Sequence, residues 1–355
     1  MAKLTISDHH HNLTFNIIHE FFFGFGVAFH DVSTILPLFL TLLGAPISVA
    51  GSIAGLFAIL IAAPQLISAI ISRNIQNVKI STVKIHLTIL PPIFLAGFVF
   101  AFFMPTGPKA WIFYYICFVF YALGIGLIIP IWSNFLRHVT KRSNRGTFLG
   151  ISFIGNSIGG FIGGIVVKKL LSSSIPFPAN FGWGFLILFF ALIISISSFL
   201  GFKVKDIQTN QRKRTIKDFI HETKSILITN QNFRRYVYSR ILLTAQFPAI
   251  SLYAVYSRDM FYFDISDAGL LTATRLIAFG FGSIIAGQIG DRIGHKAAMT
   301  FCFACHVFTM GVALTAQSMI WIYGIFVCLG LAQGAFMPAA MSLVFDFAGK
   351  KGDNK

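Results

Sequence analysis

Charged residues are scarce in this chain of 355 residues. Lysine, arginine, aspartate and glutamate together make up 11% of it, whereas 55% is hydrophobic. Soluble domains carry roughly 25% charged residues, because their surface has to be hydrated. A soluble globular fold is therefore excluded, and we expect most of the apolar surface to face lipid.

Acidic residues are the rarest charged class, 12 against 28 basic residues, and the net charge is +16. A basic chain can bind nucleic acid. Here, however, the basic residues lie in short segments between long apolar runs, which is where membrane proteins carry their orientation signals. We therefore expect the lipid bilayer as a partner, and no nucleic acid.

The common motifs of catalysis and nucleotide binding are also missing. Cys302-Phe-Ala-Cys305-His306 matches the pattern of c-type haem attachment, but it lies within an apolar run, so we expect small thiol side chains packed in a helix instead. The sequence contains no H-E-x-x-H, G-x-S-x-G or G-x-x-x-x-G-K-[ST] pattern. Its four cysteines all fall within apolar runs and indicate neither a disulfide framework nor a redox compartment. We expect neither an enzyme nor ATP hydrolysis, and no cofactor or metal.

Long apolar runs are what the sequence has in abundance. A helix needs about 20 mainly apolar residues to cross a bilayer, and the runs here are continuous rather than alternating, which favours helices over a β-barrel. We predict an all-α membrane protein. Ten spans are expected, at 16–42, 47–71, 82–104, 110–136, 147–170, 181–203, 234–257, 267–289, 297–317 and 320–345.

The distribution of basic residues predicts the orientation. If the N-terminus is cytoplasmic, 22 of the 28 lysines and arginines fall on the inner side of the membrane. The outer loops then hold Lys109, Lys168, Lys169 and Arg258. By the positive-inside rule, both termini are cytoplasmic.

One long polar connector divides the spans. We predict a six-helix transmembrane bundle in 1–203, a basic cytoplasmic connector in 204–233, and a second bundle of helices 7–10 in 234–355. The connector contains TIKDFIHETKSIL, in which Ile216 and Leu227 share one helical face and Thr215 is a suitable N-cap. A short amphipathic helix on the cytoplasmic surface is expected there.

A compact polar turn, GQIGDRIGHK at 287–296, separates two apolar runs. Its glycines are expected to let the chain reverse tightly, and Asp291 suits a helix cap or an ion pair. The turn resembles the signature G-x-L-A-D-R-x-G-R-K of the major facilitator superfamily. The six helices, the basic connector and the second helical set also resemble that family's two-halved plan.

The resemblance implies a helical bundle that works as a secondary transporter, with the signature acting as a cytoplasmic gate. In that family the aspartate contacts the start of a helix in the opposite half, so Asp291 is expected to face Arg145, Gly146 and Thr147 when the inner side is closed. The alternative is a turn that only fixes orientation. The predicted gate residues are Gly287, Gly290, Asp291, Arg292, Gly294, Lys296 and Arg145.

Two departures from the family pattern weaken the functional prediction. The equivalent turn between the second and third spans, SAIISRNIQNVK, has Ser72 in place of the aspartate and Ile75 in place of a glycine. The family usually has twelve helices, whereas ten are predicted here, so the second half is expected to be incomplete, with about four helices. The alternative function is a non-transporting truncated relic, or a membrane scaffold or sensor.

Charges inside a bilayer are costly, so those within the spans are functional candidates. His30 and Asp31 lie near the middle of the first span, and Arg275 near the middle of the eighth. Asp31 could bind a proton or a cation, and Arg275 an anion or a counter-charge. A purely structural Asp–Arg pair explains both residues as well.

Other polar residues in the spans are weaker candidates. Arg240 lies one to two turns into the seventh span, where its side chain could reach the surface. Glu20 is expected to reach water at the inner end of the first span. Further candidates, any of which could simply bond a neighbouring helix, are Gln65, Asn134, Asn156 and Gln246.

The fifth span is rich in glycine. Its spacing resembles the antiporter motif of the superfamily, but Gly160 replaces the expected proline, and the fourth span lacks the arginine typical of proton-coupled exporters. Close packing of helices through small residues is the other interpretation. The glycines concerned are Gly146, Gly155, Gly159, Gly163 and Gly164.

Together these features predict a secondary active transporter that moves a small solute by alternating access, with a proton gradient as the coupling force. We expect a monomer in the cytoplasmic (inner) membrane of a bacterium. The identity of the solute and the direction of transport do not follow from the sequence.

Overall fold

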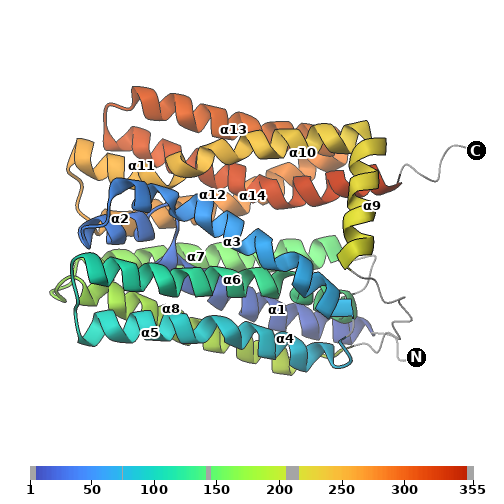
Figure 1. The fold of residues 1–355 in the computed structure, drawn as a ribbon, viewed down its shortest axis with the longest axis horizontal. Coiled ribbons are helices and arrows are strands. Elements are labelled where there is room, and N and C mark those ends of the chain that lie inside the picture. Colours follow the sequence, from blue (N-terminus) through green and yellow to red (C-terminus); the bar gives the residue numbers. More distant parts are fainter. Residues whose placement is uncertain (1–4, 74, 141–144, 205–215, 350–355) are drawn as a thin grey trace, which may run out of the picture. The chain divides into compact units, whose positions relative to one another are not determined.

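The computed structural model describes residues 5–73, 75–140, 145–204 and 216–349 (Figure 1). Within these ranges every regular element is a helix, so the predicted all-α fold is confirmed. Nine helical stretches of the described chain are long and apolar enough to cross a membrane. Helices suit this environment because their backbone groups bond within the same segment.

The first part of the chain forms eight α-helices and three short 3₁₀ turns. They are α1 (Ile6–Val27), η1 (Ala28–His30), α2 (Ile35–Leu42), α3 (Ile47–Arg73), α4 (Val78–His86), η2 (Leu87–Ile89), α5 (Leu90–Phe102), α6 (Pro108–Val139), α7 (Arg145–Leu171), α8 (Ala179–Ser198) and η4 (Phe199–Gly201).

The second part begins with the helix expected in the connector. Its elements are α9 (Ile216–Thr229), α10 (Gln231–Leu243), η5 (Thr244–Gln246), α11 (Phe247–Phe261), α12 (Asp267–Arg292), α13 (His295–Thr315) and α14 (Met319–Gly349). Thr215, the proposed N-cap of α9, lies outside the described residues.

The chain forms two compact units. Unit 1 comprises Met1–Arg212 and Ile250–Ala273, and unit 2 comprises Lys213–Ala249 and Thr274–Lys355. Most of α11 and the first turns of α12 therefore belong to the same unit as α1 to α8. The functional division at the connector stays a prediction.

The expected seventh span is the one that differs from the others. Residues 231–261 are helical, as α10, η5 and α11, but they are not among the nine apolar stretches of the described chain. Arg234, Arg235 and Arg240 make α10 polar. Pro248 lacks an N–H and its ring crowds the carbonyl four residues earlier, which accounts for the 3₁₀ turn η5 just before it.

Large aromatic side chains fill the interior of unit 1. Phe39 of α2 packs edge-on against Phe100 of α5 and Tyr114 of α6, with ring centroids 5.0 Å apart in both pairs. Tyr114 in turn stacks on Phe185 of α8 at 5.2 Å. Four elements of unit 1 thus meet in one aromatic core.

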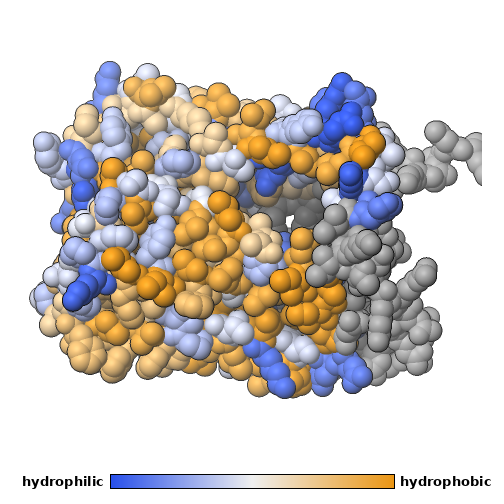
Figure 2. Space-filling model, in the orientation of Figure 1, coloured by the Kyte–Doolittle hydropathy of each residue, from blue (hydrophilic) through white to orange (hydrophobic). Residues whose placement is uncertain are grey.

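Apolar side chains also cover the outside of unit 1. Ile59 of α3, Phe102 of α5 and Phe120 of α6 are each more than half exposed. Figure 2 shows such hydrophobic side chains gathered over these helices. A surface of this kind is stable only against lipid.

Helices α1 and α7 run in the same direction in backbone contact. A Cβ at Gly159 would lie 2.1 Å from the carbonyl oxygen of Phe21, and a Cβ at Gly163 would lie 2.4 Å from that of Phe25. No side chain other than hydrogen fits there. Small residues are the usual means of bringing two membrane helices so close.

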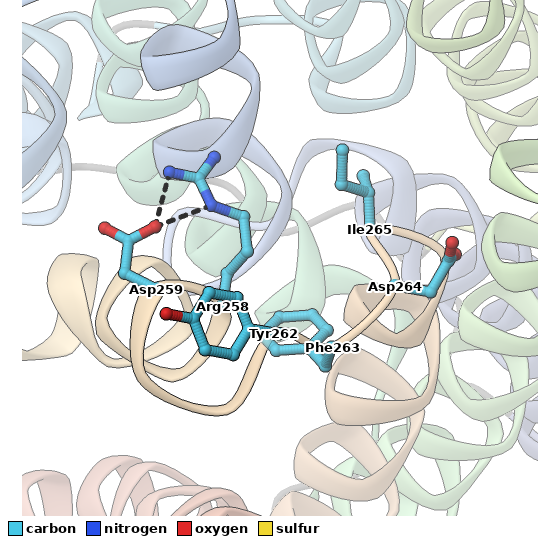
Figure 3. Close-up of a pocket in the computed structure, with 6 residues that line it drawn as sticks. All are labelled: Arg258, Asp259, Tyr262, Phe263, Asp264 and Ile265. Atoms are coloured by element: carbon cyan, nitrogen blue, oxygen red, sulfur yellow. Dashed lines mark hydrogen bonds and ion pairs between the residues drawn. The ribbon is translucent and has the colours of Figure 1, made fainter.

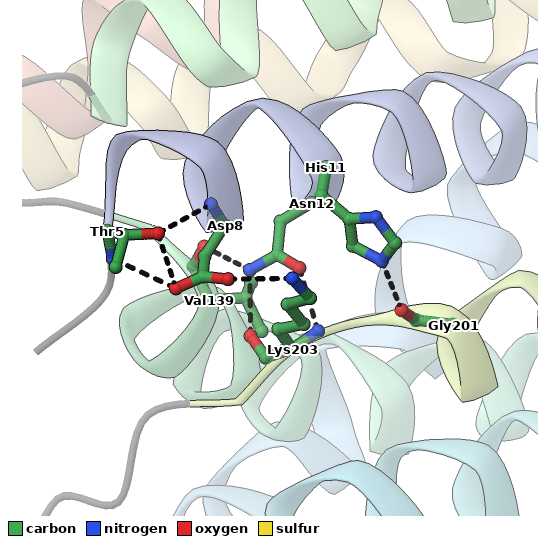
Figure 4. Close-up of polar contacts among 7 residues, drawn as sticks. All are labelled: Thr5, Asp8, His11, Asn12, Val139, Gly201 and Lys203. Atoms are coloured by element: carbon green, nitrogen blue, oxygen red, sulfur yellow. Dashed lines mark hydrogen bonds and ion pairs between the residues drawn. The ribbon is translucent and has the colours of Figure 1, made fainter. Parts of the chain in front are cut away.

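Polar contacts tie the start of α1 to the end of α6 and to the chain just after η4 (Figure 4). The Asn12 amide donates to the carbonyls of Val139 and Lys203, and its oxygen accepts from the Lys203 N–H at 2.8 Å. Asp8 forms an ion pair of 2.9 Å with the Lys203 side chain. We call Asp8, Asn12 and Lys203 the N-terminal clasp.

The three consecutive histidines at 9–11 belong to this region. They are part of α1, with His9 buried and His11 bonded to the carbonyl of Gly201 at 2.8 Å. The residues before the first predicted span are thus folded into unit 1.

Glycine-mediated packing of α1 on α7 leads to a first prediction. Gly159→Ala should lower the apparent melting temperature of the purified protein, because relieving the overlap with Phe21 costs about 1–3 kcal/mol. Gly150→Ala is the matched control, since nothing lies within 4 Å of a Cβ there. Equal melting temperatures for the two variants would contradict the close contact.

Candidate functional site

The first membrane-spanning stretch, Ile6–Leu42, is broken in its middle. α1 ends at Val27, η1 continues it to His30, and α2 starts only at Ile35. Pro37 explains the break, because its ring would crowd the carbonyl of residue 33 in a continuous helix, whereas a proline is tolerated in the first turn of α2. Asp31 has an extended backbone, with φ −72° and ψ 124°.

Asp31 fills the gap that this break leaves in the backbone hydrogen bonds. Its Oδ1 accepts from the backbone N–H of Ser33 at 2.8 Å, from the Ser33 hydroxyl at 2.5 Å and from the Thr34 hydroxyl at 3.1 Å. The residue is only 2% exposed. A side chain that bonds the N–H two residues later forms an Asx turn, so Asp31 holds the broken segment in shape.

His30 lies beside Asp31 within an aromatic shell. Its Nε2 is 3.0 Å from the Tyr114 hydroxyl. The rings of Tyr121, Phe118 and Phe185 lie 4.7, 5.9 and 5.8 Å from the imidazole, centroid to centroid. The break therefore places two adjacent ionisable groups deep inside unit 1.

A second polar link joins the break to α12. The hydroxyls of Thr34 and Thr272 are 2.5 Å apart, and either can donate. Thr272 is also 2.8 Å from the carbonyl oxygen of Ala268. A chain of hydroxyl groups thus runs from the Asp31 carboxylate to the first turns of α12.

The first turns of α12 pack tightly on the end of α7. A Cβ at Gly164 would lie 2.6 Å from the Ala273 nitrogen, and a Cβ at Gly269 would lie 2.3 Å from the Lys168 nitrogen. Beside these glycines, Lys168 forms an ion pair of 3.0 Å with Asp267. Both side chains are partly exposed, at 39% and 27%. We call Gly164, Lys168, Asp267 and Gly269 the α7–α12 contact.

The loop between α11 and α12 carries a pocket of about 620 Å³. In Figure 3, Arg258 and Asp259 lie at one end of it and Asp264 and Ile265 at the other. Arg258 donates to Asp259 at 2.9 Å. The hydroxyl and the backbone N–H of Ser266 bond to Asp264 and lower the pKa of its carboxyl group.

Unit 2 contains the two arginines predicted within spans. The Arg275 guanidinium donates to the side-chain oxygen of Gln333 on α14 at 2.5 Å. The Arg240 guanidinium lies over the ring of Phe336, also on α14, at 3.8 Å. Such a cation–π contact is stabilising when the charge is partly removed from water. In the described part of unit 2, no carboxylate pairs with Arg240.

The weaker candidates have different surroundings. Asn134 donates to the carbonyl of Ser72 at 2.9 Å and so joins α6 to α3. Gln246 is buried in η5, and its side-chain oxygen has no partner among the described residues. Gln65 lies half-buried on α3. A role of these three residues in a substrate or proton path stays a prediction.

Fewer residues of the polar turn at 287–296 take part in reversing the chain than the sequence predicts. Gly287 and Gly290 lie inside α12, which continues to Arg292, so they do not reverse the chain. Gly294 alone has a positive φ, of 117°, and precedes α13. Only glycine adopts such a conformation without strain.

The polar side chains of this turn face outward. Asp291, Arg292 and Lys296 are exposed. Neither Asp291 nor Arg292 forms an ion pair with another residue of the described chain. The side chain of Arg145 is not among the described parts of the structure. The contact expected between Asp291 and Arg145 therefore stays a prediction.

The glycines of the fifth span contact two neighbouring helices. Gly155, Gly159 and Gly163 face α1, whereas Gly164 faces α12. This is the arrangement that close helix packing requires. An antiporter role for the same residues stays a prediction.

Sequence reasoning missed several polar residues of unit 1. Glu20 was expected in water but is 4% exposed. Lys168 was named only as part of an outer loop, and Asp267 was not singled out. Their charges were visible in the sequence, but charges 99 positions apart carry no sign that they pair. Thr272 gave no signal, because a threonine in an apolar run is common.

The buried charges, the broken span and the glycine-packed helices belong to a chain with several helices long and apolar enough to cross a membrane. The sequence matches the Major Facilitator Superfamily over residues 21–353. The chain belongs to this family of transporters, and the resemblance of its polar turn to the family signature is confirmed at the level of the family.

Solved structures share the fold at low sequence identity. A mutant of the nucleoside transporter NupG superposes with a TM-score of 0.68 at 13% identity, over 94% of this chain and 83% of that chain. The xylose transporter XylE from E. coli gives a TM-score of 0.61 at 13% identity, over 96% and 86%. A bacterial homologue of the human lysosomal transporter Spinster, in an inward-facing and unoccupied conformation, gives 0.65 at 13%, over 96% and 75%.

One curated relative is similar over a short part of the chain. Sugar phosphate exchanger 3 of Xenopus laevis is 33% identical over 90 residues, which is 24% of this chain and 18% of that protein. The match thus spans less than a fifth of the relative.

The role of Asp31 in the break can be tested by two substitutions. Asp31→Ala should lower the melting temperature, because the buried N–H of Ser33 loses its partner at a cost of about 1–3 kcal/mol. Asp31→Asn keeps an acceptor oxygen at the same place and should lower it less. If both variants melted alike, Asp31 would not hold the broken segment.

Proposed function

We propose that the protein is a secondary transporter that moves a small polar solute by alternating access, driven by a proton gradient. The observation that carries this proposal is the α7–α12 contact beside the broken first span. Through this contact the first turns of α12 pack on α7 within unit 1, whereas the rest of α12 belongs to unit 2.

The composition of the α7–α12 contact suits repeated opening. Two glycines bring the backbones together without interlocking side chains, and one partly exposed ion pair lies beside them. Exposed ion pairs contribute only about 0–1 kcal/mol, so this ion pair adds little to the cost of parting the two helices. With the predicted orientation, this contact is at the outer face, and its opening would admit solute from outside.

The broken span provides a site near the membrane centre. Broken helices commonly form the binding sites of transporters, because the freed backbone groups and the side chains beside them can bind solutes and ions. Asp31 and His30 lie at this break, and a hydroxyl chain connects Asp31 to Thr272. Within the proposal, Asp31 and His30 take up and release the coupling proton.

The solute class is open to a directed search. The structural relatives named above include a nucleoside transporter and a xylose transporter, so the fold alone does not select a substrate. Sugar phosphates belong first in the search, because the short curated match carries that name. Arg240 and Arg275 supply guanidinium groups, which bind phosphate in bidentate fashion.

The proposal is tested with purified protein in liposomes. Uptake of sugar phosphates, nucleosides, xylose and dipeptides is measured with and without an imposed pH gradient, and empty liposomes are the control. We expect uptake of one solute class that collapses when a protonophore removes the gradient. No flux of any solute in either direction would instead favour a scaffold or sensor.

The α7–α12 contact gives a sharper prediction. In a variant without the four native cysteines, Lys168→Cys and Asp267→Cys are joined by a short, reducible bifunctional thiol reagent. Transport should stop on cross-linking and return on reduction, because the two side chains must separate in each cycle. The single variants, treated alike, are the controls. Unchanged flux in the cross-linked protein would show that this contact stays closed.

A further inference from the structure

Glu20 is a buried carboxylate in the second half of α1, which in the predicted orientation is still the inner half of the spanning stretch Ile6–Leu42. It is 4% exposed, although its position near the inner end of the first span predicts contact with water. In the described structure its hydrogen-bond partner is the Asn156 amide of α7, which donates to Oε2 at 2.9 Å. No basic side chain of the described chain pairs with it.

Asn16 lies one helical turn before Glu20 on the same side of α1. It is completely buried, and neither its side-chain nitrogen nor its oxygen has a partner among the described residues. A buried amide without partners is costly, and such a group in a native fold calls for an explanation. Glu20 and Asn16 are therefore two buried polar groups, one helical turn apart, whose bonding capacity is not fully used.

Close packing around Glu20 and Asn16 prevents a shift of α1 that would bring either side chain into contact with water. A Cβ at Gly24 would lie 2.1 Å from the carbonyl oxygen of Asn156, so α1 and α7 touch through their backbones next to Glu20. On the other side of Asn16, a Cβ at Gly155 would lie 3.2 Å from the Ile17 side chain. The carboxyl group stays where its charge is poorly solvated.

The ionisable groups on the neighbouring helices do not supply a counter-charge. α7 carries none between Arg145 and Lys168, and α8 with η4 carries none from Ala179 to Gly201. His19 of α1 directs its ring to Ser195 of α8, with Nδ1 2.7 Å from the hydroxyl. His86 of α4 bonds the carbonyl of Thr82 in its own helix.

A carboxylate in this position needs a positive partner, because an isolated charge in a low-dielectric site is too costly to keep. Calcium and magnesium ions require six or more oxygen ligands. Glu20, Asn16 and Asn156 offer too few side-chain oxygens, and the backbone carbonyls around them are engaged within helices. A proton requires one oxygen, and the unpartnered Asn16 oxygen one turn away is a suitable acceptor for the resulting O–H.

We propose that Glu20 is a second proton-binding site, separate from Asp31, that carries the coupling proton through the inner half of the membrane. The two carboxyl groups are eleven positions apart on the same spanning stretch, about 16 Å along a helix. The functional part of this inference rests on the proposed transport function, whereas the protonation of Glu20 does not.

Infrared spectroscopy tests the protonation directly, without a substrate. Purified protein at neutral pH should show the carbonyl stretching band of a protonated carboxylic acid, and this band should shift in D₂O. Glu20→Gln should remove the component of this band that Glu20 contributes, whatever Asp31 adds to it. Asp8→Asn is the control that should leave it unchanged, because Asp8 is paired with Lys203 at the surface.

Asn16→Leu distinguishes a proton site from a merely buried acid. Removing the acceptor weakens the hydrogen bond of the O–H, so the band should move to higher frequency while the protein stays folded. This variant also keeps the test decisive if Glu20→Gln fails to fold. An unchanged band in both variants, or no such band in the native protein, would overturn the proposal.

Sodium and transport supply two further readouts. Replacing choline chloride by sodium chloride should leave the band in place, and its loss would instead identify a sodium site.

In liposomes, Glu20→Gln should abolish gradient-driven uptake but retain exchange of labelled for unlabelled solute. If the native protein carried the infrared band but moved no solute, the proposed function would fail while Glu20 remained a protonated site.

Discussion

Every backbone polar group inside the hydrocarbon layer has to find its partner within the protein. This constraint makes all described elements helical, and it decides how a helix can be interrupted. The break after His30 is possible because the Asp31 side chain accepts the N–H that the helix leaves unbonded. The same side chain is also the charge at the centre of the proposed transport site, so structure and function depend there on a single oxygen atom.

Helix α1 combines two roles that would conflict in a simple membrane helix. One side touches α7 through glycines, and an adjoining stripe carries the buried polar residues Asn12, Asn16, His19 and Glu20, the last of which also bonds to α7. Asn12 and His19 bond to other segments of unit 1, which makes them part of its architecture. Asn16 and Glu20 keep unused bonding capacity, which is why they stand out as a place for a proton.

The positions of the spans could be predicted because length and apolar composition are properties of single segments. The seventh span shows where this approach stops, because the arginines of α10 make the segment too polar to be recognised by its length and hydropathy. The surroundings of Glu20 could not be predicted, because hydropathy does not show which side of a helix meets a neighbour. Equally, nothing at position 34 or 272 indicates that the two hydroxyls meet, and the polar turn indicated the family but not that α12 would run through its first glycines.

The N-terminal clasp has a consequence for how the protein is made. Asn12 is satisfied only when the peptide at Lys203 is in place, and these residues belong to the first and the last of the six opening helical spans. During synthesis the first helix is inserted long before residue 203 leaves the ribosome, and domains form in order from the N-terminus. The side-chain amide of Asn12 therefore lacks its partners at Lys203 until the sixth span has been inserted.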